Sequence, residues 1–288
     1  MSALPPRPLE GHHVVITGAA QGIGAAIAET LAHQGAVLTL AGRRQPVLET
    51  LAQRLQAVTC CAVVTMDVSD ANAVAQGFAQ ARAALGPVSM LVNNAGQAES
   101  APFGKTSPEL WQRMLDVNLT GTFLCTQAAL PDMLAARAGR IVNIASTAGQ
   151  RGYAYVAAYV AAKHGVIGLT RALALEMAQK GITVNAVCPG YTETEILRQS
   201  INNVMAKTGR SEADAMAEFV KGNPQGRLVQ PDEVANAVLW LCAEGASAIT
   251  GQPAGPFGRG HCAPQVAAAV AVDHFAGAGA GCRGLCLL

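Results

Sequence analysis

Near its N-terminus the chain contains the stretch Val14-Val15-Ile16-Thr17-Gly18-Ala19-Ala20-Gln21-Gly22-Ile23-Gly24. The apolar, β-branched residues predict a buried strand, and the glycines that follow predict a tight turn into a helix. Glycines in such a turn let backbone N–H groups approach a pyrophosphate, which the N-terminus of the helix attracts. A strand–turn–helix of this composition also occurs without a ligand, so the surrounding sequence has to decide between the two interpretations.

Two kinds of segment alternate along the rest of the chain. Short apolar runs predict buried strands at 14–17, 36–40, 62–66, 90–93, 141–144 and 183–187. Longer segments rich in Ala, Leu, Glu and Gln predict helices at 23–33, 46–55, 71–84, 110–136, 154–179 and 231–243. This alternation is typical of right-handed crossovers, which build a parallel sheet with helices on both faces. We therefore expect a single doubly wound α/β domain over residues 1–252, which places the glycine turn where dinucleotides bind.

Two segments depart from this alternation. Residues 192–222 are polar, contain a helix-like stretch at 211–220, and follow the carboxyl end of a strand, so we expect a lid over a ligand site. Residues 253–288 are an atypical tail. Their start, Pro253-Ala254-Gly255-Pro256-Phe257, disfavours another central strand. An Ala/Gly-rich stretch follows, which is either a frameshifted version of an ordinary C-terminus or a genuine divergent tail.

The composition excludes several classes of protein. The 288 residues are 51% hydrophobic and 14% charged, with a formal net charge of +1 and no long basic run, which argues against a nucleic-acid partner. No apolar stretch reaches the roughly 18 residues of a membrane span, and residues 1–10 lack a signal core. The eight cysteines are scattered without metal-ligand spacing. We expect reduced thiols, no metal and a cytoplasmic location.

Further motifs follow the glycine turn in a fixed order. They are Asn93-Asn94-Ala95-Gly96, Asn118, Ser146, Tyr159-(x3)-Lys163 and Pro189-Gly190. Together with Thr17-Gly18-(x3)-Gly22-Ile23-Gly24, this series resembles the short-chain dehydrogenase/reductase family over about residues 10–251. The resemblance implies a Rossmann-type fold, a nicotinamide cofactor and an oxidoreductase. It also implies that residues 93–96 line the cofactor and steady the central strands.

The chemistry of the tyrosine and lysine can be argued from their spacing. Tyr159 and Lys163 are four residues apart on a predicted helix, so their side chains share a face. A nearby ammonium is expected to lower the pKa of the phenol and make Tyr159 a usable general acid or base. Ser146, at the end of a predicted strand, can hydrogen-bond the substrate oxygen. Tyr153 and Tyr155 lack a lysine four residues on, so we expect them in a pocket wall or in the core.

The family resemblance adds a fourth catalytic residue. It implies that Asn118 holds a water in a proton relay that reaches Lys163, and that Lys163 also contacts the nicotinamide ribose. The expected catalytic residues are Asn118, Ser146, Tyr159 and Lys163.

The end of the second strand bears on the choice of cofactor. The position where a carboxylate would bind the adenosine ribose and repel a 2′-phosphate is Gly42. Arg43 and Arg44 follow, and arginine forks suit a phosphate. The resemblance therefore implies NADP(H), although two solvated loop charges would have the same sequence. Gln21 stands where NADP(H)-preferring relatives often carry a basic residue, which keeps NAD(H) as the less favoured option.

The remaining cofactor contacts follow from the resemblance. Asp67-Val68 corresponds to the adenine-contacting pair, with a plain helix N-terminal residue as the alternative for Asp67. Thr194 corresponds to the threonine that holds the nicotinamide carboxamide. The expected cofactor-binding residues are Thr17, Gly18, Gln21, Gly22, Ile23, Gly24, Arg43, Arg44, Asp67, Val68, Asn94, Ala95, Gly96, Tyr159, Lys163, Pro189, Gly190, Thr192 and Thr194.

The sequence thus predicts an oxidoreductase that transfers a hydride between NADP(H) and a ketone or secondary alcohol, with a 3-oxoacyl thioester favoured. Residues 97–103, 150–155 and the lid are expected to recognise this small-molecule substrate. One alternative is a cofactor-binding protein whose altered C-terminus leaves little turnover. Another is a sugar-nucleotide epimerase, which shares YxxxK but normally has a larger C-terminal domain. The family also implies a homo-oligomer, a dimer or tetramer, in which the final strand contributes to a subunit interface.

Overall fold

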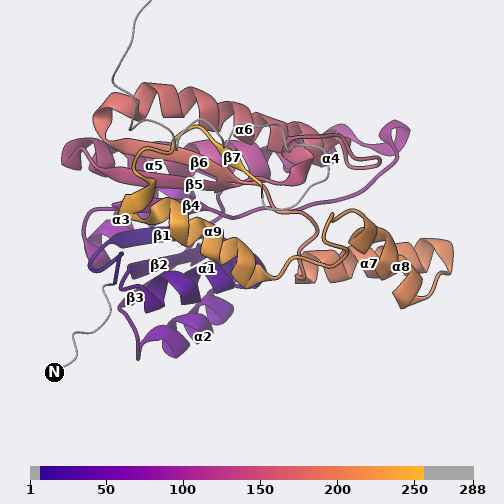
Figure 1. The fold of residues 1–288 in the computed structure, drawn as a ribbon, viewed down its shortest axis with the longest axis horizontal. Coiled ribbons are helices and arrows are strands. Elements are labelled where there is room, and N and C mark those ends of the chain that lie inside the picture. Colours follow the sequence, from indigo (N-terminus) through magenta and orange to yellow (C-terminus); the bar gives the residue numbers. More distant parts are fainter. Residues whose placement is uncertain (1–6, 256–288) are drawn as a thin grey trace, which may run out of the picture. The chain divides into compact units, whose positions relative to one another are not determined.

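The computed structural model describes residues 7–255, so most of the predicted tail lies outside the described residues. Its centre is a parallel sheet in the order β3-β2-β1-β4-β5-β6-β7, with helices against both faces (Figure 1). This confirms the predicted fold class. The strands are β1 (His13–Thr17), β2 (Val37–Gly42), β3 (Cys61–Thr65), β4 (Met90–Asn93), β5 (Gly139–Ile144), β6 (Ile182–Val187) and β7 (Pro253–Ala254). The helices are α1 (Gly22–His33), α2 (Gln45–Leu55), α3 (Ala71–Leu85), α4 (Pro108–Leu115), α5 (Gly121–Ala136), α6 (Ala157–Met177), α7 (Glu195–Thr208), α8 (Glu212–Lys221) and α9 (Pro231–Cys242).

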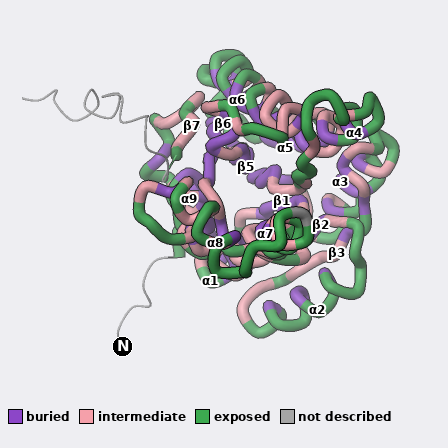
Figure 2. Tube along the Cα trace, turned by 90° about the vertical axis from the view of Figure 1, so that its right-hand side faces the viewer, coloured by how far each residue is buried: buried purple, intermediate pink, exposed green. Residues whose placement is uncertain are grey.

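The core consists of two apolar layers, one on each face of the sheet. All five residues of β1 are buried, as expected for a central parallel strand (Figure 2). Because side chains alternate along a strand, Val14 and Ile16 pack with α1, α2 and α9, whereas Val15 packs with α3, α5 and α6. Packing on both faces holds the carboxyl ends of the strands in register. No helix in residues 7–255 is long and apolar enough to cross a membrane.

The predicted helix 110–136 is wrong in one respect. The structure divides it into α4 and α5, with a π-helical turn at Asp116–Thr120 between them. The turn contains Asn118, whose side chain is fully buried. Wider turns of this kind occur mostly inside α-helices at functional positions, and hydrophobic periodicity alone does not reveal them.

The lid contains more structure than its polar sequence suggested. Besides the expected helix, α8, it forms α7, and the two helices pack around a small apolar cluster of their own that includes Leu197, Ile201 and Ala215. In Figure 1 both helices lie to the right of the sheet, beyond one end of α9. At the base of the lid, the buried amide of Asn223 accepts a hydrogen bond from the Tyr191 N–H at 3.0 Å and donates to the Tyr191 carbonyl at 2.8 Å.

The sequence disfavoured a further central strand after Gln252, and the structure forms a two-residue strand at the edge of the sheet instead. Pro253 and Ala254 pair in parallel with Ala186 and Val187 as the edge strand β7. The Ala186 N–H donates to the Gln252 carbonyl at 2.9 Å, and the Cys188 N–H donates to the Ala254 carbonyl at 2.8 Å. A proline lacks an N–H but is tolerated at the start of an edge strand, because its carbonyl side can still pair. Residues from Pro256 onward lie outside the described part of the chain.

A buried histidine at the start of β1 makes the stability of this fold depend on pH. His13 Nδ1 lies 2.9 Å from the Gly86 carbonyl, and Nε2 lies 2.8 Å from the Thr39 hydroxyl. A carbonyl only accepts, so Nδ1 carries the proton of the neutral ring and Nε2 accepts from Thr39. Burial lowers the pKa of His13, against the opposing effect of the Gly86 carbonyl. Protonation of His13 is therefore more favourable in the unfolded chain than in the folded one. As the pH falls through the unfolded-state pKa of about 6.5 and below, the free energy of unfolding decreases.

We expect the free energy of unfolding to fall between about pH 7 and pH 5, with up to about 1.4 kcal/mol per pH unit coming from His13. His13→Gln should flatten this slope because its amide does not titrate. His33→Gln, at the exposed end of α1, is the control and should keep the slope of the parent protein. Urea unfolding at several pH values measures the slope of the free energy of unfolding against pH in each protein. Equal slopes in all three proteins would contradict the role assigned to His13.

Candidate active site

The predicted glycine turn lines one end of a cavity of about 870 Å³. Gly18 and Gly22 have φ of +65° and +54°, a region that favours glycine. A Cβ at Gly24 would lie 2.3 Å from the Gly18 carbonyl oxygen, so only glycine fits there. The turn thus leaves backbone N–H groups open to the cavity at the N-terminus of α1. This is an anion cradle of the kind that a dinucleotide pyrophosphate requires.

Thr17 has a different place from the one predicted. It does not line the cavity but lies behind the turn, where its hydroxyl accepts hydrogen bonds from the backbone N–H groups of Asn94 and Ala95, each at 3.0 Å. The Asn94 amide donates to the carbonyls of Thr17 and Gly18, each at 3.0 Å. These bonds tie the glycine turn to the end of β4, so Thr17 supports the cradle without reaching its interior.

The far end of the cavity lies beyond β2. Arg43 and Arg44 line it together with Asp67, and Arg43 Nη1 lies 3.7 Å from Asp67 Oδ2. Although burial raises the pKa of Asp67, hydrogen bonds from Ser69 and the charge of Arg43 outweigh this and lower it, so Asp67 is a carboxylate at neutral pH. A Cβ at Gly42 would meet only Leu48 methyl groups at 3.8 and 3.9 Å and the Gly18 Cα at 4.0 Å. This end therefore has room for a phosphate and exposed guanidinium groups beside it.

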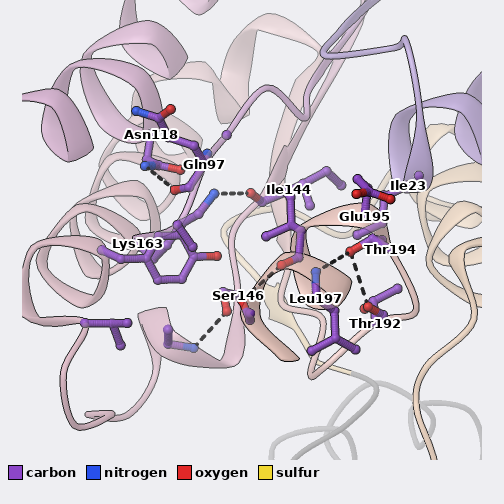
Figure 3. Close-up of a pocket in the computed structure, with 18 of the residues that line it drawn as sticks. Ile23, Gln97, Asn118, Ile144, Ser146, Lys163, Thr192, Thr194, Glu195 and Leu197 are labelled. Atoms are coloured by element: carbon purple, nitrogen blue, oxygen red, sulfur yellow. Dashed lines mark hydrogen bonds between the residues drawn. The ribbon is translucent and has the colours of Figure 1, made fainter. Parts of the chain in front are cut away.

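The predicted catalytic side chains gather where the cavity passes the ends of β4 and β5 (Figure 3). Lys163 is buried, and its Nζ donates to the Ile144 carbonyl at 2.8 Å and lies 5.7 Å from the centre of the Tyr159 ring. Ser146 begins a short helical turn and accepts a hydrogen bond from the Ala148 N–H at 3.0 Å. Across the cavity in Figure 3 lie Thr192, Thr194 and Glu195.

Asn118 faces the same part of the cavity from the π-helical turn. Its amide donates to the carbonyls of Gln97 and Met114, each at 2.9 Å, and its Oδ1 accepts from the Gln97 N–H at 3.2 Å. A Cβ at Gly96 would lie 2.9 Å from this Oδ1 and 3.6 Å from Lys163 Nζ. Gly96 therefore permits the close approach of Asn118 and Lys163 that the family pattern implied.

The proton equilibria differ from the expectation for Tyr159. Burial raises the pKa of the Tyr159 phenol, and a hydrogen bond from Ser146 opposes this only in part. Burial disfavours the charged form of Lys163 as well, and for an ammonium this lowers the pKa, to about 8. The expected lowering of the phenol pKa by the ammonium is not found with the side chains in these positions. At neutral pH Tyr159 therefore holds its proton, and Lys163 is charged below about pH 8.

The segment after β6 closes the cavity from the lid side. The Pro189 carbonyl accepts from the Thr147 N–H at 3.0 Å, and the Thr194 hydroxyl accepts from the Leu197 N–H at 3.5 Å at the start of α7. A Cβ at Gly22 would lie 3.2 Å from the Thr194 methyl group, so the base of the lid lies against the glycine turn.

The structure brings nearly all predicted site residues to one cavity. Those that line it are Gly18, Gln21, Gly22, Ile23, Gly24, Arg43, Arg44, Asp67, Val68, Asn94, Ala95, Gly96, Asn118, Ser146, Tyr159, Lys163, Pro189, Gly190, Thr192 and Thr194. Sequence reasoning expected the lid to contact the substrate but did not identify the helix α7, whose lining residues are Glu195, Ile196, Leu197, Ser200, Asn203, Val204 and Thr208. Most of these residues recur at intervals of three and four, as on one helix face, and this signal could have found the helix.

Comparison with known proteins identifies the family. Residues 12–204 match the family model of the short chain dehydrogenases, and the chain belongs to this family. It is 41% identical over 239 residues to an acetoacetyl-CoA reductase of Shinella zoogloeoides, covering 82% of this chain and 93% of the relative. It is 36% identical over 241 residues to a D-beta-hydroxybutyrate dehydrogenase of Rhizobium meliloti, covering 82% and 93%. A solved structure of a tryptophan variant of actinorhodin polyketide ketoreductase with NADPH superposes with a TM-score of 0.83 at 37% identity, covering 88% of this chain and 98% of that one.

Proposed function

We propose that the protein is an NADP(H)-dependent oxidoreductase that interconverts a ketone and a secondary alcohol, and that its substrate is a 3-oxoacyl thioester. The observation that carries this proposal is one cavity that joins a glycine cradle to Ser146, Tyr159 and Lys163. The named activities of the acetoacetyl-CoA reductase and D-beta-hydroxybutyrate dehydrogenase relatives, which act on a 3-oxo and a 3-hydroxy group, support the substrate class.

The chain's own residues fit the cofactor at both ends. The open N–H groups of residues 18–24 would hold the pyrophosphate, and Arg43 and Arg44 would hold the 2′-phosphate. Bound NADPH supplies the hydride, and the related actinorhodin ketoreductase was solved with this cofactor. Residues 189–194 and Lys163 would position the nicotinamide end near the catalytic side chains.

The catalytic side chains would then handle the oxygen of the substrate. Ser146 hydrogen-bonds the ketone oxygen and stabilises the negative charge that develops on it. Tyr159, whose raised pKa keeps it protonated, donates the proton that completes the alcohol. Lys163, whose Nζ lies 5.7 Å from the centre of the Tyr159 ring, and Asn118, which lines the same cavity, would take part in returning a proton to Tyr159.

The alternative of a cofactor-binding protein with little turnover is not supported. It rested on the altered C-terminus, yet β7 still pairs with β6, and the catalytic side chains come from the turn after β5, from α6 and from the π-helical turn. The epimerase alternative likewise gains no support, because the relatives that match over most of the chain are named as a reductase and a dehydrogenase.

We also propose a cytoplasmic homo-oligomer, either a dimer or a tetramer. Large apolar side chains are exposed on the outer helices of the described chain, and such surfaces commonly mark protein contacts. On α4, α5 and α6 these side chains are Trp111, Phe123, Leu134 and Leu175.

A substrate screen tests the proposed function. NADPH oxidation is followed with acetoacetyl-CoA, cyclic ketones and sugars as substrates, with the NADH rate recorded in parallel. We expect kcat/KM for acetoacetyl-CoA to exceed that for the cyclic ketones and sugars by at least about tenfold, because these lack the second carbonyl and the acyl chain that the pocket would contact. Reduction of sugars but not of oxoacyl thioesters would overturn the substrate class.

A further inference from the structure

Three side chains in the loop after β5 form a hydrogen-bonded cluster beside the catalytic Ser146. The Tyr153 hydroxyl lies 2.8 Å from Arg151 Nε, 2.6 Å from Arg151 Nη2 and 2.8 Å from Thr147 Oγ1. The guanidinium carbon of Arg151 is also 4.8 Å from the centre of the Tyr153 ring. Thr147 and Tyr153 both line the cavity, and Thr147 is next to Ser146 in the chain. None of these three has a catalytic or cofactor-binding role in the proposed function.

The direction of each hydrogen bond follows from the chemistry of the groups. Arginine can only donate, so the oxygen of Tyr153 accepts twice from Arg151 and has no lone pair left. The Tyr153 proton must then be donated, and Thr147 Oγ1 is the acceptor within reach among the described residues. Thr147 is therefore an acceptor toward Tyr153. Its own hydroxyl proton has no acceptor within the described chain, so it remains available to a ligand in the cavity.

We infer that Thr147 is a specificity-determining residue that donates a hydrogen bond to the second carbonyl of a 1,3-dicarbonyl substrate, and that Arg151 and Tyr153 position its hydroxyl for this. The inference rests on the proposed function, in which Ser146 and Tyr159 bind the ketone that is reduced. A 3-oxoacyl thioester carries its thioester carbonyl two carbons from that ketone, so it presents a second acceptor next to the first. A simple ketone has no second carbonyl, so it leaves the buried Thr147 hydroxyl without an acceptor when it binds. An unpartnered buried donor costs free energy, and we therefore expect a simple ketone to bind less tightly than a 3-oxoacyl thioester.

The same cluster contacts the lid. Arg151 Nη2 donates to the Gly222 carbonyl at the end of α8, at 3.3 Å. The rings of Tyr153 and Tyr191 stack edge to face with centres 6.0 Å apart, and those of Tyr191 and Phe219 with centres 5.0 Å apart. The position of the lid and the orientation of the Thr147 hydroxyl are therefore coupled through Arg151 and Tyr153, which makes these two residues positioning residues.

The test compares two substrates in the parent enzyme and in Thr147→Val. We expect kcat/KM for acetoacetyl-CoA to fall by about tenfold, the usual loss for one hydrogen bond, while that for cyclohexanone changes by less than about twofold. Thr147→Ser keeps the hydroxyl and should restore the preference for acetoacetyl-CoA. Thr50→Val, an exposed threonine on α2, is the matched control and should change neither value. Melting temperatures establish that each variant folds, and Thr147→Ala serves if Thr147→Val does not.

A double variant separates positioning from a structural role. If Tyr153 acts through Thr147, Tyr153→Phe lowers the preference for acetoacetyl-CoA, and Thr147→Val with Tyr153→Phe lowers it no further than Thr147→Val alone. Fully additive losses would overturn the positioning role of Tyr153. A parent enzyme that reduces acetoacetyl-CoA but whose preference survives Thr147→Val would overturn this inference alone. A parent enzyme that does not reduce acetoacetyl-CoA would instead overturn the proposed function on which it rests.

Discussion

Tyr159→Phe is expected to lower kcat for carbonyl reduction by about a hundredfold to ten-thousandfold, which is the usual contribution of a positioned general acid. The substitution removes the hydroxyl that holds the transferable proton and leaves the ring in place. The glycine turn and the arginines at the other end of the cavity are unchanged, so the dissociation constant for NADPH should stay within about threefold of the parent value, because no hydrogen bond to the phosphates is lost.

Stopped-flow turnover and a fluorescence titration with NADPH measure these two quantities separately. Circular dichroism establishes that the variant folds. Residual turnover within about tenfold of the parent enzyme would contradict the role of Tyr159, because a lost proton donor costs more than that.

Gly42→Asp together with Arg43→Ala is expected to change the ratio of kcat/KM for NADPH over NADH by about a hundredfold in favour of NADH. Loss of one charged hydrogen bond accounts for about 10- to 100-fold, and the new carboxylate adds repulsion of the 2′-phosphate. The side chain has room, because a Cβ at Gly42 meets no atom closer than 3.8 Å. Without Arg43, Asp67 also loses the guanidinium 3.7 Å away, so the local charge becomes more negative.

Arg54→Ala on α2 is the matched control for this prediction. It removes an exposed guanidinium that pairs with Glu29 and does not line the cavity. Its cofactor ratio should equal that of the parent enzyme. A parent enzyme that already prefers NADH would contradict the assignment of Arg43 and Arg44 to a 2′-phosphate.

The sequence predicted the sheet well because the strands are buried on both faces. All six expected strands are found within two residues of their predicted ends, since their continuous apolar runs have no polar alternation to obscure them. The errors occurred where tertiary contacts decide. The π-helical turn at Asp116–Thr120 interrupts an otherwise periodic helix, and β7 begins at a proline that its edge position tolerates.

The candidate site could be predicted where motifs fix local geometry. The glycine turn and the Tyr159–Lys163 spacing act within one turn or one helix, so they could be assigned from the sequence. The protonation of Tyr159 could not, because burial decides its pKa and the sequence suggested only the charge of Lys163. The Arg151–Tyr153–Thr147 cluster also escaped, because its hydrogen bonds depend on how the loop folds back on itself.

The most direct test of the central claim, hydride transfer to a 3-oxoacyl thioester, follows the transferred hydrogen itself. The full-length protein is incubated with acetoacetyl-CoA and NADPH that carries deuterium on one or the other face of nicotinamide C4. Mass spectrometry then measures the mass of the product and locates the deuterium. We predict 3-hydroxybutyryl-CoA with a single deuterium on the carbinol carbon from one labelled form and none from the other. No reduced product, or a product without deuterium from either form, would contradict the account.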